Sequence, residues 1–270
     1  MTMIQVLNCP ICEGAPSIMD RVRTINPDAD DRIDLRACTD CGHWWHTPIP
    51  DQATLYSLYQ AASPFVVGQG ARESYEHGRE TDPPFHRFVL TMASLSGARG
   101  RYLEIGTGGG HLLRRFRKQG YECYGVEPGQ WVPDGAVYPN LDALPPRLSF
   151  GIVVLQDVLE HVADPPALLR RLRSMVAGDA EMFACFPCCE SRPALRYRSA
   201  WNMVMPYGHL HYFSHESARQ LFSRAGWRIR QARLSRHQSL TEHLARWRWR
   251  ALAYELLKGG RDQLHVCASV

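Results

Sequence analysis

The chain has 270 residues, of which 45% are hydrophobic and 21% are charged, a composition typical of a globular protein with a substantial core. No apolar run approaches the roughly 18 residues that a membrane span needs, and the opening stretch lacks the basic and apolar regions of a signal peptide. Nine cysteines are too few for a disulfide scaffold. Secreted, fibrous, membrane and disordered classes are therefore excluded, and we expect a cytoplasmic protein without a membrane partner.

Charge is distributed unevenly along the chain, although the net charge is only +4. Residues 1–70 carry four Arg against eight Asp and Glu, whereas residues 217–261 carry eleven Arg and Lys against two Glu. Binding of nucleic acid needs a positive surface, so the acidic first part argues against such a partner. Near residues 246–250 Arg alternates with Trp, and a helix there would present an apolar stripe to the sheet or to a second copy. The sequence therefore leaves undecided whether the chain forms a homodimer.

Two CxxC pairs lie in the first 50 residues and are separated by 25 residues. Two such pairs bring four thiolates to the corners of a tetrahedron around one Zn²⁺ ion, and four protein ligands leave no position open for catalysis. We therefore expect a structural zinc site in residues 1–50, with the ligands Cys9, Cys12, Cys38 and Cys41. His43 and His46 are alternative ligands that the arrangement does not require.

Strands and helices alternate over the last two thirds of the chain. Short apolar runs predict seven strands, at residues 101–105, 121–126, 136–138, 150–155, 180–186, 227–234 and 263–268. Helices are predicted at residues 84–96, 111–119, 165 onward after the N-cap Asp164, 215–225 after Ser214, and 240–258. The alternation indicates an α/β domain over residues 99–270, with a mainly parallel seven-stranded sheet and helices on both faces. Residues 51–98 are predicted to be a helical connecting or lid segment.

A glycine-rich loop follows the first of these strands. It reads Glu104-Ile-Gly-Thr-Gly-Gly-Gly110, and glycines there allow a tight turn and a close approach of a ligand to the backbone. A dinucleotide-binding GxGxxG pattern would need Gly or Ala at position 111, where His111 stands. The pattern that fits is an acidic residue two positions before GxGxG.

This loop resembles motif I of the class I S-adenosylmethionine-dependent methyltransferases, which have a Rossmann-like fold. The resemblance implies that the loop packs against the methionine and ribose portions of the cofactor. It further implies that Glu127, at the end of the second strand, accepts hydrogen bonds from both ribose hydroxyls. The cofactor-binding residues implied are Glu104, Gly106, Thr107, Gly108, Gly110, Glu127, Pro128 and, near the adenine, Leu141.

The run from residue 150 to residue 162 resembles the fourth-strand motif of the same superfamily, with Gly151 in place of the usual Asp. By this resemblance, Gln156 and Asp157 line the cofactor cleft. Some relatives that O-methylate quinol precursors place a divalent ion on a similar acidic run. A divalent ion at Asp157, Glu160 and His161 is one interpretation, and hydrogen bonding of Glu160 and His161 to the local turn is the other.

The segment from Tyr207 to Ser214 resembles the GHLHYFS segment that many of these methyltransferases place over the substrate pocket. The resemblance implies that Tyr207, His209, His211 and Tyr212 contact the acceptor. A hydroxyl or protonated amine must lose a proton on methylation, and His titrates near the operating pH. His209 or His211, and next His161, are therefore the candidate catalytic bases; the alternative is that these residues only cap the loop or the following helix.

The N-terminal CPxC…CxxCG arrangement resembles the zinc ribbon fused to a subset of small-molecule methyltransferases. The sequence thus predicts a ribbon (1–50), a connecting or lid segment (51–98) and a catalytic domain (99–270). The leading hypothesis is a methyltransferase of small-molecule biosynthesis that uses S-adenosylmethionine on an O, N or C atom of a specialised metabolite or sugar-like acceptor. The alternatives are an RNA base methyltransferase whose ribbon contacts RNA, and a non-catalytic cofactor-binding or interaction module. Asp82-Pro-Pro-Phe85 spells the tetrapeptide of amino-group methyltransferases, but we interpret Asp82 as the N-cap of a helix.

Overall fold

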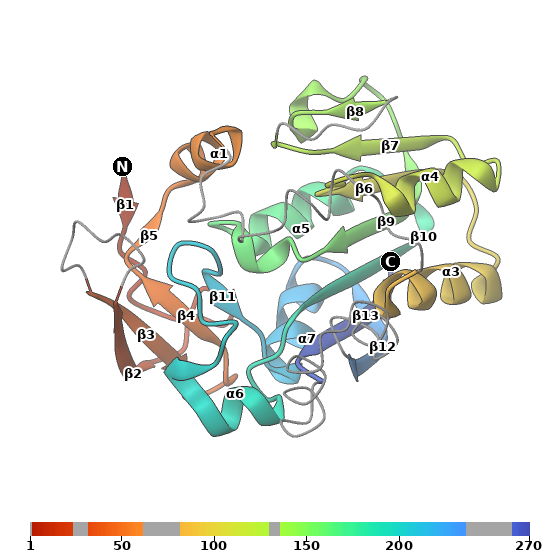
Figure 1. The fold of residues 1–270 in the computed structure, drawn as a ribbon. Helices are drawn as coiled ribbons and strands as arrows, with labels where there is room; N and C mark the ends of the chain where they lie inside the picture. Colours follow the sequence, from red (N-terminus) through yellow and green to blue (C-terminus); the bar gives the residue numbers. More distant parts are fainter. Residues whose placement is uncertain (1, 24–31, 62–81, 130–135, 236–260) are drawn as a thin grey trace, which may run out of the picture.

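The computed structural model describes residues 2–23, 32–61, 82–129, 136–235 and 261–270. A seven-stranded sheet with the order β12-β13-β10-β9-β6-β7-β8 forms its centre (Figure 1). The strands are β6 (Arg101–Ile105), β7 (Cys123–Val126), β8 (Val137–Tyr138), β9 (Phe150–Gln156), β10 (Val176–Pro187), β12 (Arg228–Ser235) and β13 (Gln263–Ser269). Each coincides with a stretch that the sequence predicts as a strand, which confirms the predicted fold class.

The strand order places the ligand-binding edge of the sheet. The five strands β8, β7, β6, β9 and β10 run parallel, and β13 pairs antiparallel with both β10 and β12. The chain leaves β6 toward β7 on one side and later returns to β9 on the other. In open α/β sheets, ligands bind at the carboxyl ends of the strands at such a reversal of strand order. The crevice between β6 and β9 is therefore the expected binding site.

Helices cover both faces of the sheet. One face carries α3 (Pro84–Ser96) and α4 (His111–Lys118), whose buried phenylalanines pack against Tyr102, Ile152 and Phe183. The other face carries α5 (Pro165–Arg173) and α7 (His215–Arg224), packed against the alternate side chains of the same strands. The predicted N-caps of α5 and α7 are confirmed, because Asp164 and Ser214 accept hydrogen bonds from the first turns of these helices.

The predicted N-cap of α3 is wrong. Pro83 occupies that position and makes no side-chain cap hydrogen bond. The carboxylate of Asp82 turns instead toward α4, where it contacts His111 and Arg115. Proline in the first turn is enough to start the helix, so the carboxylate is left for another role.

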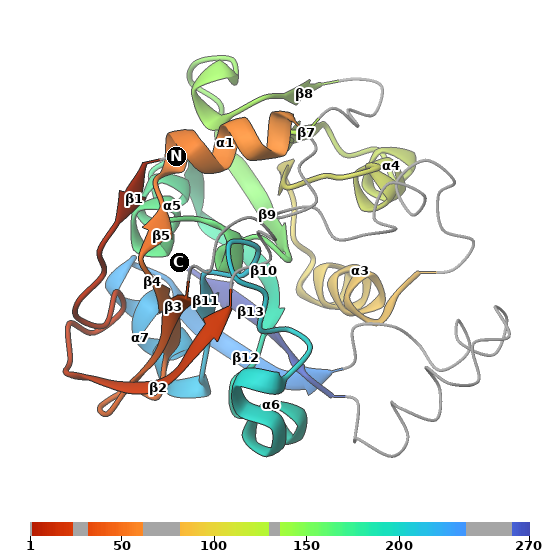
Figure 2. The same cartoon turned by 60° about the vertical axis from the view of Figure 1, so that its left-hand side comes forward.

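A second sheet, of four strands, lies beside the central one (Figure 2). Its antiparallel strands, in spatial order, are β11 (His211–Tyr212), β4 (Trp44–Thr47), β3 (Arg32–Cys38) and β2 (Pro16–Arg23). Three strands come from the predicted ribbon, but β11 comes from the segment between β10 and α7. The ribbon sheet is thus completed by the part of the chain that the sequence predicts over the acceptor pocket.

The remaining elements are short and flank these sheets. They are β1 (Met3–Ile4), β5 (Ile49–Pro50), α1 (Gln52–Gln60), η1 (Leu141–Ala143), η2 (Leu159–His161), α6 (Arg192–Tyr197) and η3 (Arg198–Ala200). The predicted helix of residues 240–258 and residues 62–81 of the predicted lid lie outside the described residues. Among the helices that are described, each is too short or too polar to cross a membrane.

The start of β9 lies so close to the residues before β6 that position 151 has no room for a side chain. A Cβ atom at Gly151 would lie 1.7 Å from the carbonyl oxygen of Arg99. We expect Gly151→Asp, which restores the residue usual in the fourth-strand motif, to lower the free energy of unfolding by about 3 kcal/mol, because the backbone must move apart. Urea denaturation followed by circular dichroism measures this change.

Gly178→Ala is the matched control, because a Cβ atom at Gly178 has nothing within 4 Å. That variant should stay within about 1 kcal/mol of the wild type. Equal stability of the two variants would show that the close approach of Gly151 and Arg99 is wrong.

Candidate functional site

The glycine loop joins β6 to α4 in a conformation that side chains oppose. Gly106, Gly108 and Gly110 have φ values of 72°, 48° and 67°, a region that favours glycine. A Cβ atom at Gly106 would also lie 2.8 Å from Cγ2 of Val158. Gly110 is the N-cap of α4. The loop therefore presents bare main chain at the carboxyl end of β6.

Glu127, directly after β7, holds this loop in place. Its Oε2 accepts a hydrogen bond from the N–H of Gly108 at 2.7 Å, and its Oε1 accepts one from the N–H of Gly129 at 2.8 Å. Burial raises the pKa of this carboxyl, and the two N–H donors oppose the rise. Beside it, the buried Oγ1 of Thr107 has no hydrogen-bond partner within the described residues. Such an atom marks a place where a polar ligand group is expected.

Glu104, the acidic residue of the loop motif, lies beneath the loop and away from solvent. It is 3% exposed, and the hydroxyl of Tyr102 donates to its Oε2 at 3.0 Å. Burial raises the pKa of Glu104 to about 8, although the Tyr102 hydrogen bond opposes the rise. The side chain is therefore largely protonated at neutral pH.

This protonation makes the stability of the fold depend on pH. Because the pKa of Glu104 in the folded chain, about 8, exceeds its ordinary value of 4.5, the folded chain keeps a proton that the unfolded chain releases in this window. The free energy of unfolding should therefore fall by about 3 kcal/mol from pH 5 to pH 8 relative to Glu104→Gln, whose amide does not titrate. Urea denaturation at the two pH values measures the difference. The same change in Glu122→Gln, at an exposed carboxylate, should leave the wild-type pH dependence intact; a flat wild-type profile would contradict the buried proton.

Gln156 and Asp157 of the fourth-strand motif lie at the carboxyl end of β9, as expected, and polar side chains of other elements face them. Oε1 of Gln156 accepts from Nε2 of His86 at 2.7 Å. Asp157, with a φ of 52°, accepts from Nε2 of Gln263 at 2.5 Å and from the thiol of Cys185 at 3.8 Å. Its carboxylate is therefore engaged by β10 and β13.

The sequence predictions missed a row of three polar residues beside Gln156, which we call the polar row. Asp82, His86 and His111 place their ligand atoms within 4.8 Å of one another, and the rings of His86 and His111 stack with centroids 5.3 Å apart. The signal was present, because His111 occupies the position at which the loop departs from GxGxxG. From the sequence alone, His111 indicates only that the loop does not match the dinucleotide-binding pattern.

Pro128 and Leu141 lie on the other side of the crevice, near β7 and β8. The carbonyl oxygen of Pro128 accepts from Nε2 of Gln60 at 3.4 Å, which brings the end of α1 to the glycine-loop side of the sheet. Leu141 begins η1, whose N-cap Asn140 accepts from the next two N–H groups. Both residues are partly buried, in keeping with the side of the crevice where the adenosine portion is expected.

The two histidines of the segment from residue 207 to residue 214, His209 and His211, do not share one environment. Nδ1 of His211 pairs with Nε2 of His43 at 3.3 Å, and its Nε2 donates to the carbonyl oxygen of Val162 at 3.1 Å. Nδ1 of His209 donates to the carbonyl oxygen of Met203 at 2.8 Å, and its ring lies against His161. The two side chains thus make separate contacts, and both nitrogens of His211 are taken up by protein groups.

Tyr212 also serves the fold in this structure. It is completely buried, and its hydroxyl lies 3.0 Å from Nε2 of His46 and donates to the carbonyl oxygen of His209 at 3.1 Å. Tyr207 has a φ of 66° and is partly exposed, at the turn before β11. Of the four predicted acceptor contacts, Tyr207 is the most accessible.

Glu160 is fully buried, and neither of its carboxylate oxygens has a hydrogen-bond partner within the described part of the chain. Its ligand atoms group with those of His161 and His209 within 4.8 Å. Asp157, the third member of the predicted ion site, is not in this group, since its carboxylate turns to Gln263 and Cys185. A buried carboxylate without donors is costly unless a cation or a proton compensates it.

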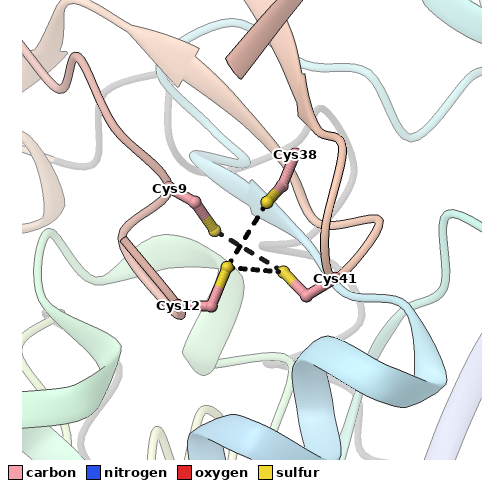
Figure 3. Close-up of side chains that lie close together, drawn as sticks. All are labelled: Cys9, Cys12, Cys38 and Cys41. Atoms are coloured by element: carbon pink, nitrogen blue, oxygen red, sulfur yellow. Dashed lines mark hydrogen bonds between the residues drawn. The ribbon is translucent and has the colours of Figure 1, made fainter. Parts of the chain in front are cut away.

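The four cysteines of the two CxxC pairs converge (Figure 3). The sulfur atom of Cys12 lies 3.3 Å from that of Cys38 and 3.4 Å from that of Cys41. The sulfur atoms of Cys9 and Cys41 are 3.6 Å apart. A tetrahedron with Zn–S bonds of about 2.3 Å has edges of about 3.8 Å. The thiols are therefore close to the arrangement that Zn²⁺ needs.

The strand order, the glycine loop at the β6–β9 reversal and the carboxylate after β7 together define a class of proteins. That class is the S-adenosylmethionine-dependent methyltransferases. A family model described as a methyltransferase domain matches residues 75–232. The match spans more than half of the chain, which belongs to this family.

Known proteins similar to this chain include methyltransferases of several kinds. A ubiquinone biosynthesis O-methyltransferase of Rhodopseudomonas palustris (strain BisB5) is 26% identical over 146 residues, which are 49% of this chain and 52% of the relative. The chain thus spans about half the length of the curated relatives it matches.

Two solved structures show the same fold at low identity. The first is a 1,6-didemethyltoxoflavin-N1-methyltransferase of Burkholderia thailandensis with bound 1,6-didemethyltoxoflavin and S-adenosylhomocysteine, at a TM-score of 0.56, 13% identity and coverage of 94% of this chain and 98% of that one. The second is a magnesium protoporphyrin IX methyltransferase of Synechocystis PCC 6803 with bound S-adenosylhomocysteine, at a TM-score of 0.55, 13% identity and coverage of 81% and 99%.

Proposed function

We propose that this chain transfers the methyl group of S-adenosylmethionine to a hydroxyl oxygen of a small-molecule acceptor. The observation that carries the proposal is the pair of hydrogen bonds that the carboxylate of Glu127 accepts from the N–H groups of Gly108 and Gly129. They hold a carboxylate and a bare glycine loop together at the reversal of strand order. A carboxylate in that place is suited to accept the two ribose hydroxyls of an adenosyl group.

The residues around the loop fit this cofactor. The unpartnered Oγ1 of Thr107 supplies a polar contact, and the absence of a side chain at Gly106 leaves the crevice beside Val158 open. When bound, the cofactor would supply an activated methyl group. Glu127 would hold the ribose, the loop would border the methionine portion, and Gln156 and Asp157 would line the side that faces the acceptor.

A small acceptor with a hydroxyl group is favoured by the relatives. The curated relative is described as an O-methyltransferase of ubiquinone biosynthesis, and the two structural neighbours carry names of small heterocyclic or tetrapyrrole acceptors. Residues 1–70 carry excess negative charge, which disfavours a polyanionic acceptor such as RNA. The chemistry then needs an oriented acceptor and a group that takes its proton.

We also propose that Cys9, Cys12, Cys38 and Cys41 hold a structural Zn²⁺ ion. The convergence of the four sulfur atoms supports this site. Four thiolates complete the coordination shell, so the ion would stabilise the knuckles and take no part in methyl transfer. The knuckle at Cys41 is joined to the acceptor side, because Ser214 Oγ donates to the carbonyl oxygen of Cys41.

A divalent ion at Glu160, His161 and His209 is the second metal site we propose. His161 and His209 each donate Nδ1–H to a main-chain carbonyl, of Gly208 and Met203 respectively. Each neutral ring then carries its lone pair on Nε2. Two such nitrogens beside an unpartnered carboxylate are a suitable ligand set for a transition-metal ion.

Methyl transfer from labelled S-adenosylmethionine tests the proposal. Catechol, 4-hydroxybenzoate and a structured transfer RNA serve as probe acceptors, with mass spectrometry of the products. Labelled methyl ether from a phenolic probe supports the proposal. Labelled RNA, without labelled phenol, favours an RNA methyltransferase, and S-adenosylhomocysteine binding without any product favours a non-catalytic module.

A further inference from the structure

The pair of Asp82 and His111 lies where the glycine loop enters α4. Oδ1 of Asp82 accepts from Nε2 of His111 at 2.9 Å. The two side chains are 19% and 22% exposed, so both are partly buried yet open to a ligand. Within the described residues, Asp82 is the one hydrogen-bond partner of the His111 ring.

The surroundings fix both members of the pair. Arg115, one turn along α4, donates from Nη2 to Oδ2 of Asp82 at 3.1 Å, so each oxygen of the carboxylate has its own donor. The ring of His86 on α3 stacks on that of His111 with an angle of 18° between their planes. His86 in turn donates from Nε2 to Gln156 at the end of β9 at 2.7 Å. His86 from α3 and Arg115 from α4 are thus the titratable or charged groups that face this pair.

The polar row of Asp82, His86 and His111 lies on the acceptor side of the crevice. Glu127 marks the β7 side of β6, where the adenosine portion is expected, whereas the contact of His86 with Gln156 marks the β9 side. A methyl group carried between these sides would face the row. His111 follows Gly110 directly, so it lies at the first residue of α4, next to the loop that would border the methionine portion of the cofactor.

His161, His209 and His211 are poorly placed to take a proton from an acceptor. His211 is completely buried, with Nδ1 paired to His43 and Nε2 donating to a carbonyl oxygen. His161 and His209 use Nδ1 for main-chain carbonyls and group with Glu160. His111 differs from them, because its ring donates a hydrogen bond to a carboxylate; its side chain is 22% exposed, against 16% for His161.

We propose that Asp82 and His111 form the acid–base pair that removes the acceptor proton during methyl transfer. The hydrogen bond from Nε2–H to Asp82 leaves the lone pair of neutral His111 on Nδ1. As the hydroxyl oxygen forms its bond to the methyl carbon, the S–C bond breaks with its electrons going to sulfur, and the hydroxyl proton passes to Nδ1. Asp82 stays a carboxylate and stabilises the imidazolium. This inference rests on the proposed function.

The test compares His111→Gln and Asp82→Asn with His215→Gln. His215 forms a second imidazole–carboxylate pair, with Glu190 at 2.5 Å, at the first residue of α7, and serves as the matched control. The first measurement is ¹⁵N NMR of the histidine rings without cofactor, with the His111 signals assigned by their loss in His111→Gln. The second is methyl transfer to catechol between pH 6 and pH 9, with calorimetric binding of S-adenosylhomocysteine measured in parallel.

We expect the Nε2–H form of neutral His111 in the wild type and a shift toward Nδ1–H in Asp82→Asn. His111→Gln should lower kcat about 100-fold at pH 7.5 and leave the affinity for S-adenosylhomocysteine within about twofold. Its rate should keep rising to pH 9, where the wild type has levelled off. His215→Gln should match the wild type in all three measurements.

Two results would overturn the inference: an Nδ1–H ring for His111 in the wild type, or a kcat of His111→Gln within about threefold of the control. If the wild type binds S-adenosylhomocysteine but leaves catechol unmodified, the inference is decided by NMR alone: an Nε2–H ring of His111 supports it and an Nδ1–H ring overturns it. Failure of the wild type to bind S-adenosylhomocysteine would refute the proposed function instead. NMR would still show which nitrogen of the His111 ring carries the proton.

Discussion

Replacing Cys38 and Cys41 with serine is expected to abolish zinc binding and to lower the melting temperature by about 10 °C or more. A structural Zn²⁺ ion contributes on the order of 10 kcal/mol to the domain that it holds together. In this chain the effect should spread beyond the ribbon, because β11 pairs with β4. Cys189 also donates from Sγ to the carbonyl oxygen of Gly42, directly after the Cys38–Cys41 knuckle.

Three measurements check this expectation: metal analysis, thermal denaturation and amide hydrogen exchange. The double variant should contain no zinc, and exchange should accelerate in residues 209–214 as well as in β3 and β4. Cys123→Ser, at a buried cysteine of β7, should retain one zinc per chain and protected exchange in β11. A wild-type protein purified without chelators that lacks zinc, or a variant with unchanged exchange in β11, would contradict the proposed site.

Replacing Glu127 with alanine is expected to weaken binding of S-adenosylhomocysteine about 100-fold. A hydrogen bond to a charged group contributes about 1.5–3 kcal/mol, and about 2.7 kcal/mol corresponds to a factor of 100. The loss has two sources, since the same carboxylate holds the N–H groups of Gly108 and Gly129 in the absence of ligand. Glu127→Gln keeps one acceptor oxygen and should lose about tenfold.

The increase in melting temperature caused by S-adenosylhomocysteine measures this effect, because a ligand stabilises the folded chain according to its affinity. At a fixed ligand concentration the shift should be largest in the wild type, smaller in Glu127→Gln and absent in Glu127→Ala. Glu122→Ala, at an exposed carboxylate that pairs with Arg101, should behave as the wild type. An equal shift in all four proteins would remove Glu127 from the cofactor site.

The central sheet and the cofactor loop are predictable because their determinants are local. A continuous apolar run such as residues 150–155 can be buried on both faces only as a strand inside a sheet. The positive φ values of the loop require the glycines that the sequence shows. Glu127 is found from its spacing, because the next parallel strand brings its end to the same edge as the loop.

The composition of the ribbon sheet could not be predicted in this way. β11 has only two residues, and its partners in β4 lie more than 160 positions earlier. No periodicity marks so short a strand, and the segment His209–Tyr212 reads equally well as a pocket wall. Its histidines are therefore catalytic candidates from the sequence, whereas burial and a main-chain hydrogen bond give His211 a role in joining the ribbon sheet to the segment after η2.

The sequence predicts the wrong role for Asp82, that of an N-cap, because a short-range pattern explains the residue. An Asp before two prolines at the start of a helix is a common N-cap pattern, and it accounts for the residue without any distant partner. The contacts with His111 and Arg115 arise only when α3 and α4 pack on the same face of the sheet. Pairings of this kind depend on tertiary structure and leave no mark in the local sequence.

Calorimetric titration of S-adenosylhomocysteine into the folded wild-type chain tests the account most directly. A single saturable site of micromolar affinity, with an enthalpy that disappears in Glu127→Ala, is the predicted result. Absence of saturable heat in a protein whose circular dichroism shows the folded α/β sheet would contradict the account, and so would undiminished affinity in Glu127→Ala.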